Sequence, residues 1–256
     1  MISPIFKTHC SLGRSILSTE DEDKITDDSP VSVIAIAQSH GLKQITVIEN
    51  SFLSFPKLYK NCNKNNIQLV FGIEFILCND VKDKTESSFL SEHKISVAMK
   101  NSQGYKDLIK LHDAINSNVE NFYYIPRGDF KTIQENWTNN LELVIPPFDN
   151  FIHKNYLLNG NCLPQFGDIK PIFTYANMEL PWNDILNKKI LDYTKNNNYE
   201  LNEVHPTYYY KTSDFKSYTI FRAIDNRAKF ANPNISYLCS NSFSFEKYMN
   251  KIGEKL

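Results

Sequence analysis

Imidazole and carboxylate side chains follow several of the expected strands, at the point where each strand ends. His9 and Cys10 follow the first of these strands, and Glu49 and Asn50 follow the second. Functional groups of an α/β barrel lie at the C-terminal ends of its strands, so we expect such side chains to converge. The candidate metal ligands are His9, Glu49, Asn50, Glu74, Asp149, Glu203 and His205. Donors of this kind bind zinc, manganese or iron, and a bound metal activates water and neutralises a phosphate.

Each candidate also has a purely structural interpretation. A single histidine near an N-terminus is more often a surface residue than a ligand. Glu74 stands in an otherwise apolar strand, where an unpaired carboxylate is costly, so it requires a specific partner. A lysine or arginine would serve that purpose as well as a metal. Glu49 and Asn50 would serve equally as caps of the following helix. The aromatic run Tyr208, Tyr209 and Tyr210 is suited to stacking on nucleic-acid bases, although aromatic strand residues more often belong to a core.

The composition limits the class of protein. The chain has 256 residues, with 28 Lys and Arg against 29 Asp and Glu, so its net charge of -1 argues against a globally basic nucleic-acid coat. No apolar run reaches the roughly 18 residues of a membrane helix, and the first residues do not resemble a signal peptide. The five cysteines are scattered and form no CxxC pair, which disfavours a disulfide framework or structural zinc site. We therefore expect a cytoplasmic protein without membrane contact.

Hydrophobic periodicity predicts the elements that would position the candidate residues. Ser29 and Pro30 suit the start of a helix over residues 31–40, and Gly41 suits its end. Further strands are expected at 42–48, 67–77, 94–99, 141–145, 171–175 and 207–210, and further helices at 52–65, 103–116, 182–196 and 213–226. Residues 20–28 form an acidic loop, and residues 79–92 and 117–135 are insertions or loops. The alternation indicates parallel βαβ units, about six or seven of them, in one barrel-like α/β domain.

These segments together resemble a known family in their order along the chain. Residues 6–11 (FKTHCS), 41–53 (GLKQITVIENSFL) and 66–75 (NIQLVFGIEF) are similar to the first conserved segments of the PHP (polymerase and histidinol phosphatase) domain that begins the bacterial DNA polymerase III alpha subunit. Residues 93–108 (HKISVAMKNSQGYKDL) give the most specific match, and residues 208–224 resemble the segment after the family's last ligands. Small phage-encoded versions look closer still, through residues 9–17 and 239–246.

The resemblance implies a distorted TIM-like (β/α)7 barrel of the PHP type, forming a single domain over residues 1–256 with its core at about 5–245. Active members of the family hold up to three metals and hydrolyse phosphoesters, and some act as a proofreading 3′-5′ exonuclease. Others have lost the ligands and serve as a platform for other replication proteins. A phage-encoded chain would work in the host cytoplasm.

This chain departs from the active pattern at several ligand positions. In the family's H-x-H motif the first histidine is Lys7, and only His9 is kept. In its T-D-H motif the aspartate is Glu49 and the histidine is Asn50, whereas the glutamate of G-x-E is kept as Glu74. Lys7 places a positive charge where a cation would bind, which disfavours a metal. Lys7 is suited instead to a salt bridge with Glu49 or Glu74, which would give a metal-free centre.

The later ligand positions are also altered. The third region falls at residues 146–149, where Asp149 is the one candidate because no histidine or cysteine is present. The closing D-x-H motif falls on Pro206 and Tyr208 in an ungapped alignment, or on Glu203 and His205 after a shift of three residues. The ungapped register is favoured because the downstream segment then fits.

The leading hypothesis is a PHP-like domain with a degraded metal centre that acts in DNA replication as a binding or scaffold module. Its expected partners are polymerase or exonuclease subunits, with DNA as a further candidate. Whether the chain is an enzyme stays open. The alternative is a metal-dependent phosphoesterase or 3′-5′ exonuclease that holds one divalent zinc, manganese or iron ion through His9, Glu49 and Glu74, with Lys7 or Arg14 pairing with a phosphate. A second alternative is a nucleic-acid-binding module that uses Tyr208, Tyr209 and Tyr210.

Overall fold

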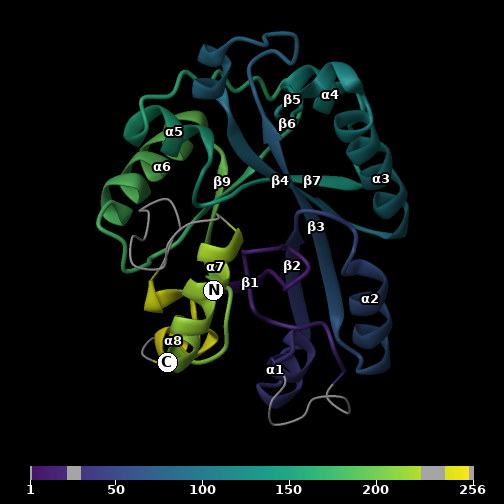
Figure 1. Ribbon diagram of the computed structural model, residues 1–256, viewed down its shortest axis with the longest axis vertical. Helices are drawn as coiled ribbons and strands as arrows, with labels where there is room; N and C mark the ends of the chain where they lie inside the picture. The colour runs from purple at the N-terminus through teal and green to yellow at the C-terminus, as the bar shows by residue number, and fades with distance from the viewer. Residues whose placement is uncertain (1, 22–29, 226–239, 254–256) are drawn as a thin grey trace. The chain divides into compact units, whose positions relative to one another are not determined.

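The computed structural model describes residues 2–21, 30–225 and 240–253. Seven strands form a closed barrel in the order β1-β2-β3-β4-β7-β8-β9, with helices between them, as Figure 1 shows. The expected α/β barrel is therefore confirmed. The barrel strands are β1 (Ser3–Phe6), β2 (Gln44–Glu49), β3 (Gln68–Leu77), β4 (His93–Met99), β7 (Leu141–Ile145), β8 (Ile172–Tyr175) and β9 (Glu200–Thr207). The helices are α1 (Val33–Ser39), α2 (Phe55–Lys64), α3 (Ser102–Asn116), α4 (Phe130–Glu135), α5 (Phe151–Leu157), α6 (Asn183–Asn197), α7 (Phe215–Asp225) and α8 (Phe245–Gly253).

The chain divides into two compact units. The first unit comprises Met1–Phe71, Ala176–Asn183 and Glu203–Leu256, and the second comprises Gly72–Tyr175 and Asp184–Asn202. The expectation of a single domain over residues 1–256 stays a prediction. The acidic loop expected at 20–28 lies mostly outside the described residues, and so does Cys239. Among the residues that the structure describes, no helix has the length and apolar character needed to cross a membrane.

In the first unit, β1 pairs in parallel with both β2 and β9, and Phe6 lies opposite Val47 and Thr207. Helix α1 begins later than its sequence predicts. Its N-cap is Ser32, whose Oγ accepts hydrogen bonds from the amides of Ile34 and Ala35, rather than Ser29, which lies outside the described residues. The start is displaced because the backbone before it pairs with Ser18, whose amide donates to the carbonyl of Val31. Gly41, with φ +65°, follows the C-cap His40 as expected.

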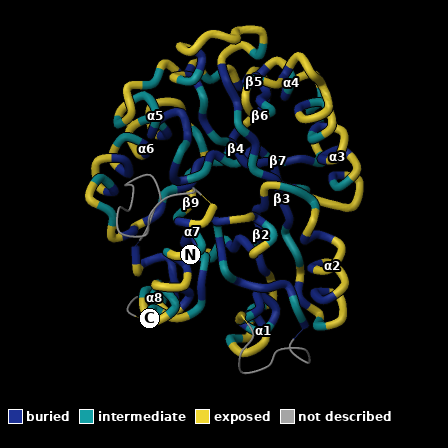
Figure 2. Tube along the Cα trace, in the orientation of Figure 1, coloured by how far each residue is buried: buried dark blue, intermediate teal, exposed yellow. Residues whose placement is uncertain are grey.

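In the second unit, β4 runs antiparallel to β3 and to β7, whereas β7 and β8 are parallel. The prediction of uniformly parallel strands is therefore wrong for β4. The reason lies in the β3–β4 connection, which contains only the 3-10 helix η2 (Glu86–Ser91) and no crossover α-helix. Parallel neighbours need such a crossover, and antiparallel neighbours do not. Figure 2 shows β4 and β7 largely buried, whereas α3 exposes its outer face.

The last barrel strand is also placed differently from its prediction. A strand was expected at residues 207–210, but β9 spans Glu200–Thr207 and ends where the expected strand begins. Its first half alternates between exposed and half-buried residues, and only the last four are buried. That polar first half carries no apolar run, so the pattern shifted the expected strand onto the aromatic residues that follow.

The insertion at residues 117–135 has regular structure of its own. It contains the 3-10 helix η3 (Val119–Asn121), a hairpin of β5 (Phe122–Tyr123) and β6 (Ile125–Pro126), and helix α4. The hairpin is a separate two-stranded sheet outside the barrel. This insertion therefore builds a surface that the seven barrel strands do not require.

Candidate functional site

The ends of β1 and β2 bring a buried carboxylate next to a polar turn in the first unit. Glu49, the last residue of β2, is only 1% exposed. Its Oε1 accepts hydrogen bonds from the amide of Thr8 (3.0 Å) and from Thr8 Oγ1 (2.5 Å), and its Oε2 accepts one from Ser11 Oγ. The glutamate that stands in place of the family's aspartate is thus held by hydrogen-bond donors of the turn after β1. Hydrogen bonds from such donors to a carboxylate are strong when the carboxylate is ionised.

Lys7 and Asn50 lie beside this carboxylate. Lys7 is 8% exposed, and its Nζ donates to Asn50 Oδ1 at 3.1 Å. The amide of Asn50 donates to Ser11 Oγ at 3.1 Å. The two residues that stand in place of family histidines therefore contact each other, and one of them supplies a cation from the protein itself. Within the first unit the structure brings together Lys7, Glu49 and Asn50 among the sequence-predicted residues.

His9 lies at the surface, one turn away. Its Nδ1 is 3.2 Å from the carbonyl oxygen of Leu17, and because a carbonyl only accepts, this contact is a hydrogen bond when Nδ1 carries a proton. Its Nε2 is 3.9 Å from Cys10 Sγ. Burial raises the pKa of the Cys10 thiol, so Cys10 stays protonated at neutral pH. Arg14 belongs to the same turn, and its amide donates to the carbonyl of Ser11.

The second unit holds the other predicted carboxylates, Glu74 and Asp149, and joins them through Lys94. Lys94 Nζ lies 3.2 Å from Glu74 Oε1 and 3.0 Å from Asp149 Oδ2. The amide of Lys94 also donates to the carbonyl of Asp149 at 2.8 Å. All three side chains are less than a third exposed, at 18%, 12% and 27% for Lys94, Glu74 and Asp149. Glu74 therefore has the specific partner that its burial requires, and that partner is an ammonium.

Asp149 has a second basic neighbour. The amide of Asp149 donates to His153 Nδ1 at 2.9 Å, and His153 Nδ1 is 3.8 Å from Asp149 Oδ1. Burial by itself would raise the pKa of Asp149, but Lys94 and His153 outweigh it, so the pKa lies below its usual range. Asp149 is thus ionised at neutral pH beside Lys94.

The strand register explains why Lys94 was not among the predicted site residues. Ile76 pairs with Lys94 and Glu74 pairs with Ser96, so Lys94 is a diagonal neighbour of Glu74 on one face of the sheet. Lys94 stands near the start of β4, and β4 is antiparallel. Its N-terminal end therefore lies level with the C-terminal end of β3. A search limited to the C-terminal ends of strands passes over it.

Glu203 and His205 lie on β9 in the first unit, away from its C-terminal end. His205 pairs with Pro4 and is fully buried. Its Nε2 is 3.1 Å from the carbonyl of Ser244, and its ring lies 5.6 Å from that of Tyr248 on α8. Glu203 Oε1 accepts a hydrogen bond from Asn177 Nδ2 at 2.9 Å. His205 thus contacts Ser244 and α8, and the choice between Pro206 with Tyr208 and Glu203 with His205 stays a prediction.

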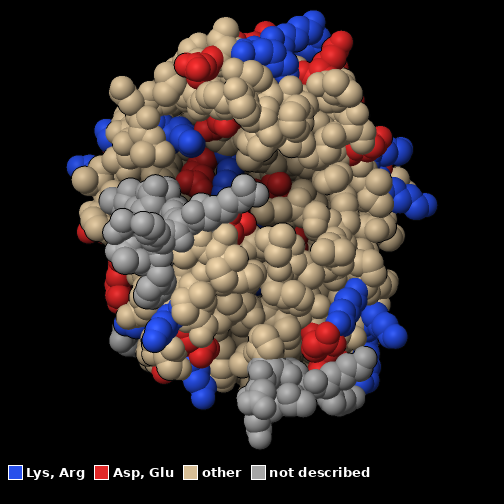
Figure 3. All heavy atoms as spheres, in the orientation of Figure 1, with Lys and Arg blue, Asp and Glu red and all other residues tan. Residues whose placement is uncertain are grey.

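The three tyrosines after β9 pack against other aromatic rings of the first unit. Tyr208 stacks on Phe243 at 5.0 Å, and Tyr210 stacks on Phe245 at 6.2 Å. Tyr209 is fully buried, and its hydroxyl donates to the carbonyl of Ser240 at 2.5 Å. On the face drawn in Figure 3, acidic and basic side chains of the described residues are interspersed rather than gathered into a basic stripe.

The donor set does not fit the family's metal centre. Glu49 accepts hydrogen bonds through both oxygens, and Lys94 lies between Glu74 and Asp149. In the described part of the chain, no three histidine, cysteine or acidic side chains are grouped so that they could hold a metal ion. A second cation next to Lys94 would be repelled by the ammonium.

Comparison with protein families agrees with this architecture. A family model described as the PHP domain matches residues 25–199. The match covers more than half of the chain, so the chain belongs to the PHP domain family. A search of curated proteins finds no match.

Proposed function

We propose that this PHP-family chain acts in DNA replication as a binding or scaffold module, and that its barrel does not carry metal-dependent catalysis. The observation that carries the proposal is the Lys94 ammonium, 3.2 Å from Glu74 and 3.0 Å from Asp149. A protein-supplied cation neutralises carboxylates that would otherwise attract a divalent ion. Lys7, which contacts Asn50, supplies a second ammonium in the first unit.

The role in replication rests on the resemblance to the polymerase III alpha subunit. Residues 93–108 resemble its PHP segment most specifically, and physical constraints account for two of their residues. The side chain of Asn101 caps α3 by accepting from the amide of Gly104 at 2.9 Å. A Cβ on Gly104 would lie 2.4 Å from the carbonyl oxygen of Asn140, so only glycine fits without movement. These constraints belong to the framework rather than to catalysis, and a framework of this kind suits a docking role.

A metal-dependent phosphoesterase or 3′-5′ exonuclease with a reduced ligand set is the second candidate function. The exposed ring of His9 favours it, because its Nδ1 contact with Leu17 leaves Nε2 available as a ligand. The two candidates differ in metal content and in hydrolysis.

We expect purified, untagged protein from medium supplemented with zinc, manganese and iron to contain less than about 0.2 metal ions per chain, because a tight site would be nearly filled. Elemental analysis measures this directly. Hydrolysis of a model phosphodiester and of 3′-ended DNA with added Mn²⁺ should not exceed that of the His9→Ala variant. Near-stoichiometric metal that is lost in His9→Ala, together with hydrolysis abolished by the same change, would overturn the proposal in favour of the enzyme.

The replication role has its own test. The full chain is immobilised, and purified replicative polymerase and proofreading exonuclease from the same source are passed over it. Saturable binding to at least one of the two proteins is expected. Absence of binding to both would contradict the role in replication, but it would not affect the conclusion from the metal measurement.

A further inference from the structure

Two insertions in the second unit build an exposed apolar surface. Residues 79–92 and 117–127 supply the large side chains of Leu90, Val119, Phe122, Tyr124 and Ile125, which are 47%, 86%, 55%, 74% and 37% exposed. We call these five residues the insertion surface. Single exposed apolar residues are ordinary, whereas five on two segments that contact each other are a feature that an interaction site would explain.

The two insertions are held together by specific contacts. Phe89 of the first insertion stacks on Tyr123 of the second at 5.1 Å and lies 5.6 Å from Tyr124. Lys84 Nζ donates to the carbonyl oxygens of Glu120 and Phe122. The insertion surface is therefore fixed in shape before any partner arrives, which lowers the entropic cost of binding.

A buried arginine lies beneath this surface. Arg127 is 0% exposed and donates to Ser88 Oγ at 2.9 Å, Glu92 Oε1 at 3.1 Å and the carbonyl of Asp83 at 2.9 Å. Its guanidinium also lies 4.9 Å from the centre of the Tyr123 ring. Burying a cation carries a desolvation penalty, which these three acceptors offset. Their hydrogen bonds hold the first insertion, residues 79–92, against Arg127 of the second.

Tyr124 stands at the tip of the hairpin with φ +61°, in the left-handed region that disfavours large side chains. Glycine would adopt this conformation without strain. The chain nevertheless places there an aromatic ring that is 74% exposed. Backbone strain at such a position is consistent with a side chain that is needed for contact rather than for folding.

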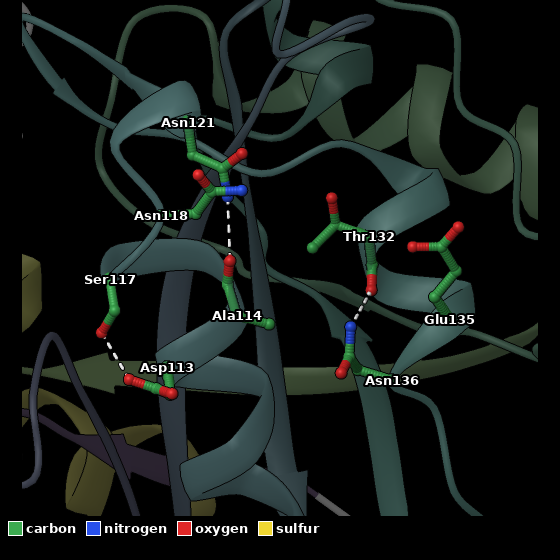
Figure 4. A pocket seen from close by; sticks show the side chains of 8 residues that line it. All are labelled: Asp113, Ala114, Ser117, Asn118, Asn121, Thr132, Glu135 and Asn136. Atoms are coloured by element: carbon green, nitrogen blue, oxygen red, sulfur yellow. Dashed lines mark hydrogen bonds between the residues drawn. The ribbon is translucent and has the colours of Figure 1, made fainter.

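An acidic pocket of about 440 Å³ is lined by Asn118 and Asn121, which lie on either side of Val119 of the insertion surface in the sequence. Figure 4 shows it between the end of α3, the turn at Asn118 and Asn121, and helix α4. The carboxylates of Asp113 and Glu135 line it; Asp113 accepts a hydrogen bond from Ser117 Oγ, and Glu135 lies 3.9 Å from the exposed Lys131 ammonium, while α3 ends there at its C-cap Ser117. The C-terminal end of a helix carries partial negative charge, so the lining favours a cation.

The charge of the insertions points to the same kind of partner. Residues 79–92 and 117–135 contain seven acidic residues and four basic ones, so their net charge is -3; the acidic ones are Asp80, Asp83, Glu86, Glu92, Glu120, Asp129 and Glu135, and the basic ones are Lys82, Lys84, Arg127 and Lys131. Nucleic acid would be repelled by this charge, and so would the same surface of a second copy.

We propose that the insertion surface docks a segment of another protein that presents apolar or aromatic side chains beside a lysine or arginine, whose cation enters the acidic pocket. This inference rests on the proposed scaffold role and names the chemistry of its partner. The aromatic side chains supply contact area at low conformational cost, and the pocket selects for positive charge.

Two matched synthetic peptides test the proposal. One carries phenylalanine and leucine beside lysines, and the other replaces each lysine by glutamate. In heteronuclear NMR titrations of the full chain, the lysine peptide should shift the amide signals of residues 117–125 with a dissociation constant on the order of 100 µM. The glutamate peptide should bind at least about tenfold more weakly.

Variants separate docking from folding. Tyr124→Gly relieves the left-handed backbone but removes the ring contacts with Phe89 and Tyr123, so the melting temperature should change little, whereas affinity for the lysine peptide should drop about tenfold. Asp113→Asn with Glu135→Gln should weaken the lysine peptide without affecting the glutamate peptide. Tyr156→Ala removes another exposed tyrosine of the second unit, 59% exposed on α5, and should change nothing.

Three results would overturn the proposal. Equal binding of both peptides would remove the selection for charge, and tighter binding of oligothymidylate at the same amides would make the surface a nucleic-acid site. A dimer seen by light scattering and lost in Tyr124→Gly would make a second copy the occupant. Each of these results can occur in a metal-free, inactive protein, so failure here is distinguishable from failure of the proposed function.

Discussion

Acidification from pH 7 to pH 4 is expected to lower the free energy of unfolding by about 3 kcal/mol for each of two buried histidines, His93 and His205. Burial lowers the pKa of each ring from 6.5 to about 4. His93 is 1% exposed, and its Nε2 has no hydrogen-bond partner among the described residues. Its Nδ1 lies 2.9 Å from the carbonyl of Ser91. Protonation of either ring would place a positive charge at a buried position of the fold.

The pH window follows from these pKa values. Between pH 6.5 and about 4 the unfolded chain binds protons at both histidines and the folded chain does not. Stability is therefore fully present above pH 6.5, falls as the pH drops through that window, and levels off with respect to these groups below about pH 4. Urea unfolding followed by circular dichroism at half-unit steps of pH measures the slope.

Phenylalanine variants assign the slope to its source. His93 stacks on Phe130 at 5.9 Å, so His93→Phe keeps the ring contact and removes the titrating group. We expect it to reduce the slope by about 1.4 kcal/mol per pH unit in this window, and His205→Phe to reduce it by a similar amount. His93 packs against Phe130 and Phe151, whereas His205 packs against Tyr248, so their effects should add. An unchanged slope in both variants would show that neither ring is the acid-sensitive group.

The sequence predicted most of the framework because local signals and fold agree there. The strand expected at residues 141–145 is observed as Leu141–Ile145, and the helix expected at 103–116 is observed as Ser102–Asn116. The last barrel strand, β9, was harder to predict. The polar start of β9 resembles a loop, and the aromatic residues after Thr207, which resemble a strand, are instead packed against rings such as Phe243 and Phe245.

The candidate site was predictable where one residue's chemistry sets its own requirement. A carboxylate in an apolar strand needs a partner, and Glu74 has one in Lys94. The identity of that partner was not predictable, because it depends on the direction of β4, which no local pattern encodes. The hydrogen bond from Lys7 to Asn50 within the first unit was not predictable either, and the expected salt bridge of Lys7 with Glu49 or Glu74 stays a prediction.

Replacing Lys94 by methionine is expected to lower the free energy of unfolding by about 3 kcal/mol, because the change removes the ammonium that both Glu74 and Asp149 contact and leaves two carboxylates close together. Lys100→Met makes the same substitution at an exposed lysine just beyond the end of β4, and it should cost less than about 0.5 kcal/mol. Urea unfolding at pH 7 compares the two variants with the parent chain. Equal stability of Lys94→Met and Lys100→Met would show that the ammonium does not stabilise this cluster.

The same variant tests whether Lys94 stands in for a metal. Once the ammonium is gone, the two carboxylates form an oxygen-rich pair of the kind that divalent manganese and calcium bind. Millimolar Mn²⁺ should therefore raise the stability of Lys94→Met by about 1 kcal/mol or more and leave the parent chain unchanged. Adding Glu74→Gln and Asp149→Asn to Lys94→Met should restore much of the lost stability without manganese and abolish the response to it, because neither charge remains. If manganese stabilised the parent chain as much as Lys94→Met, the ion would bind elsewhere, and the argument that Lys94 replaces a metal would fail.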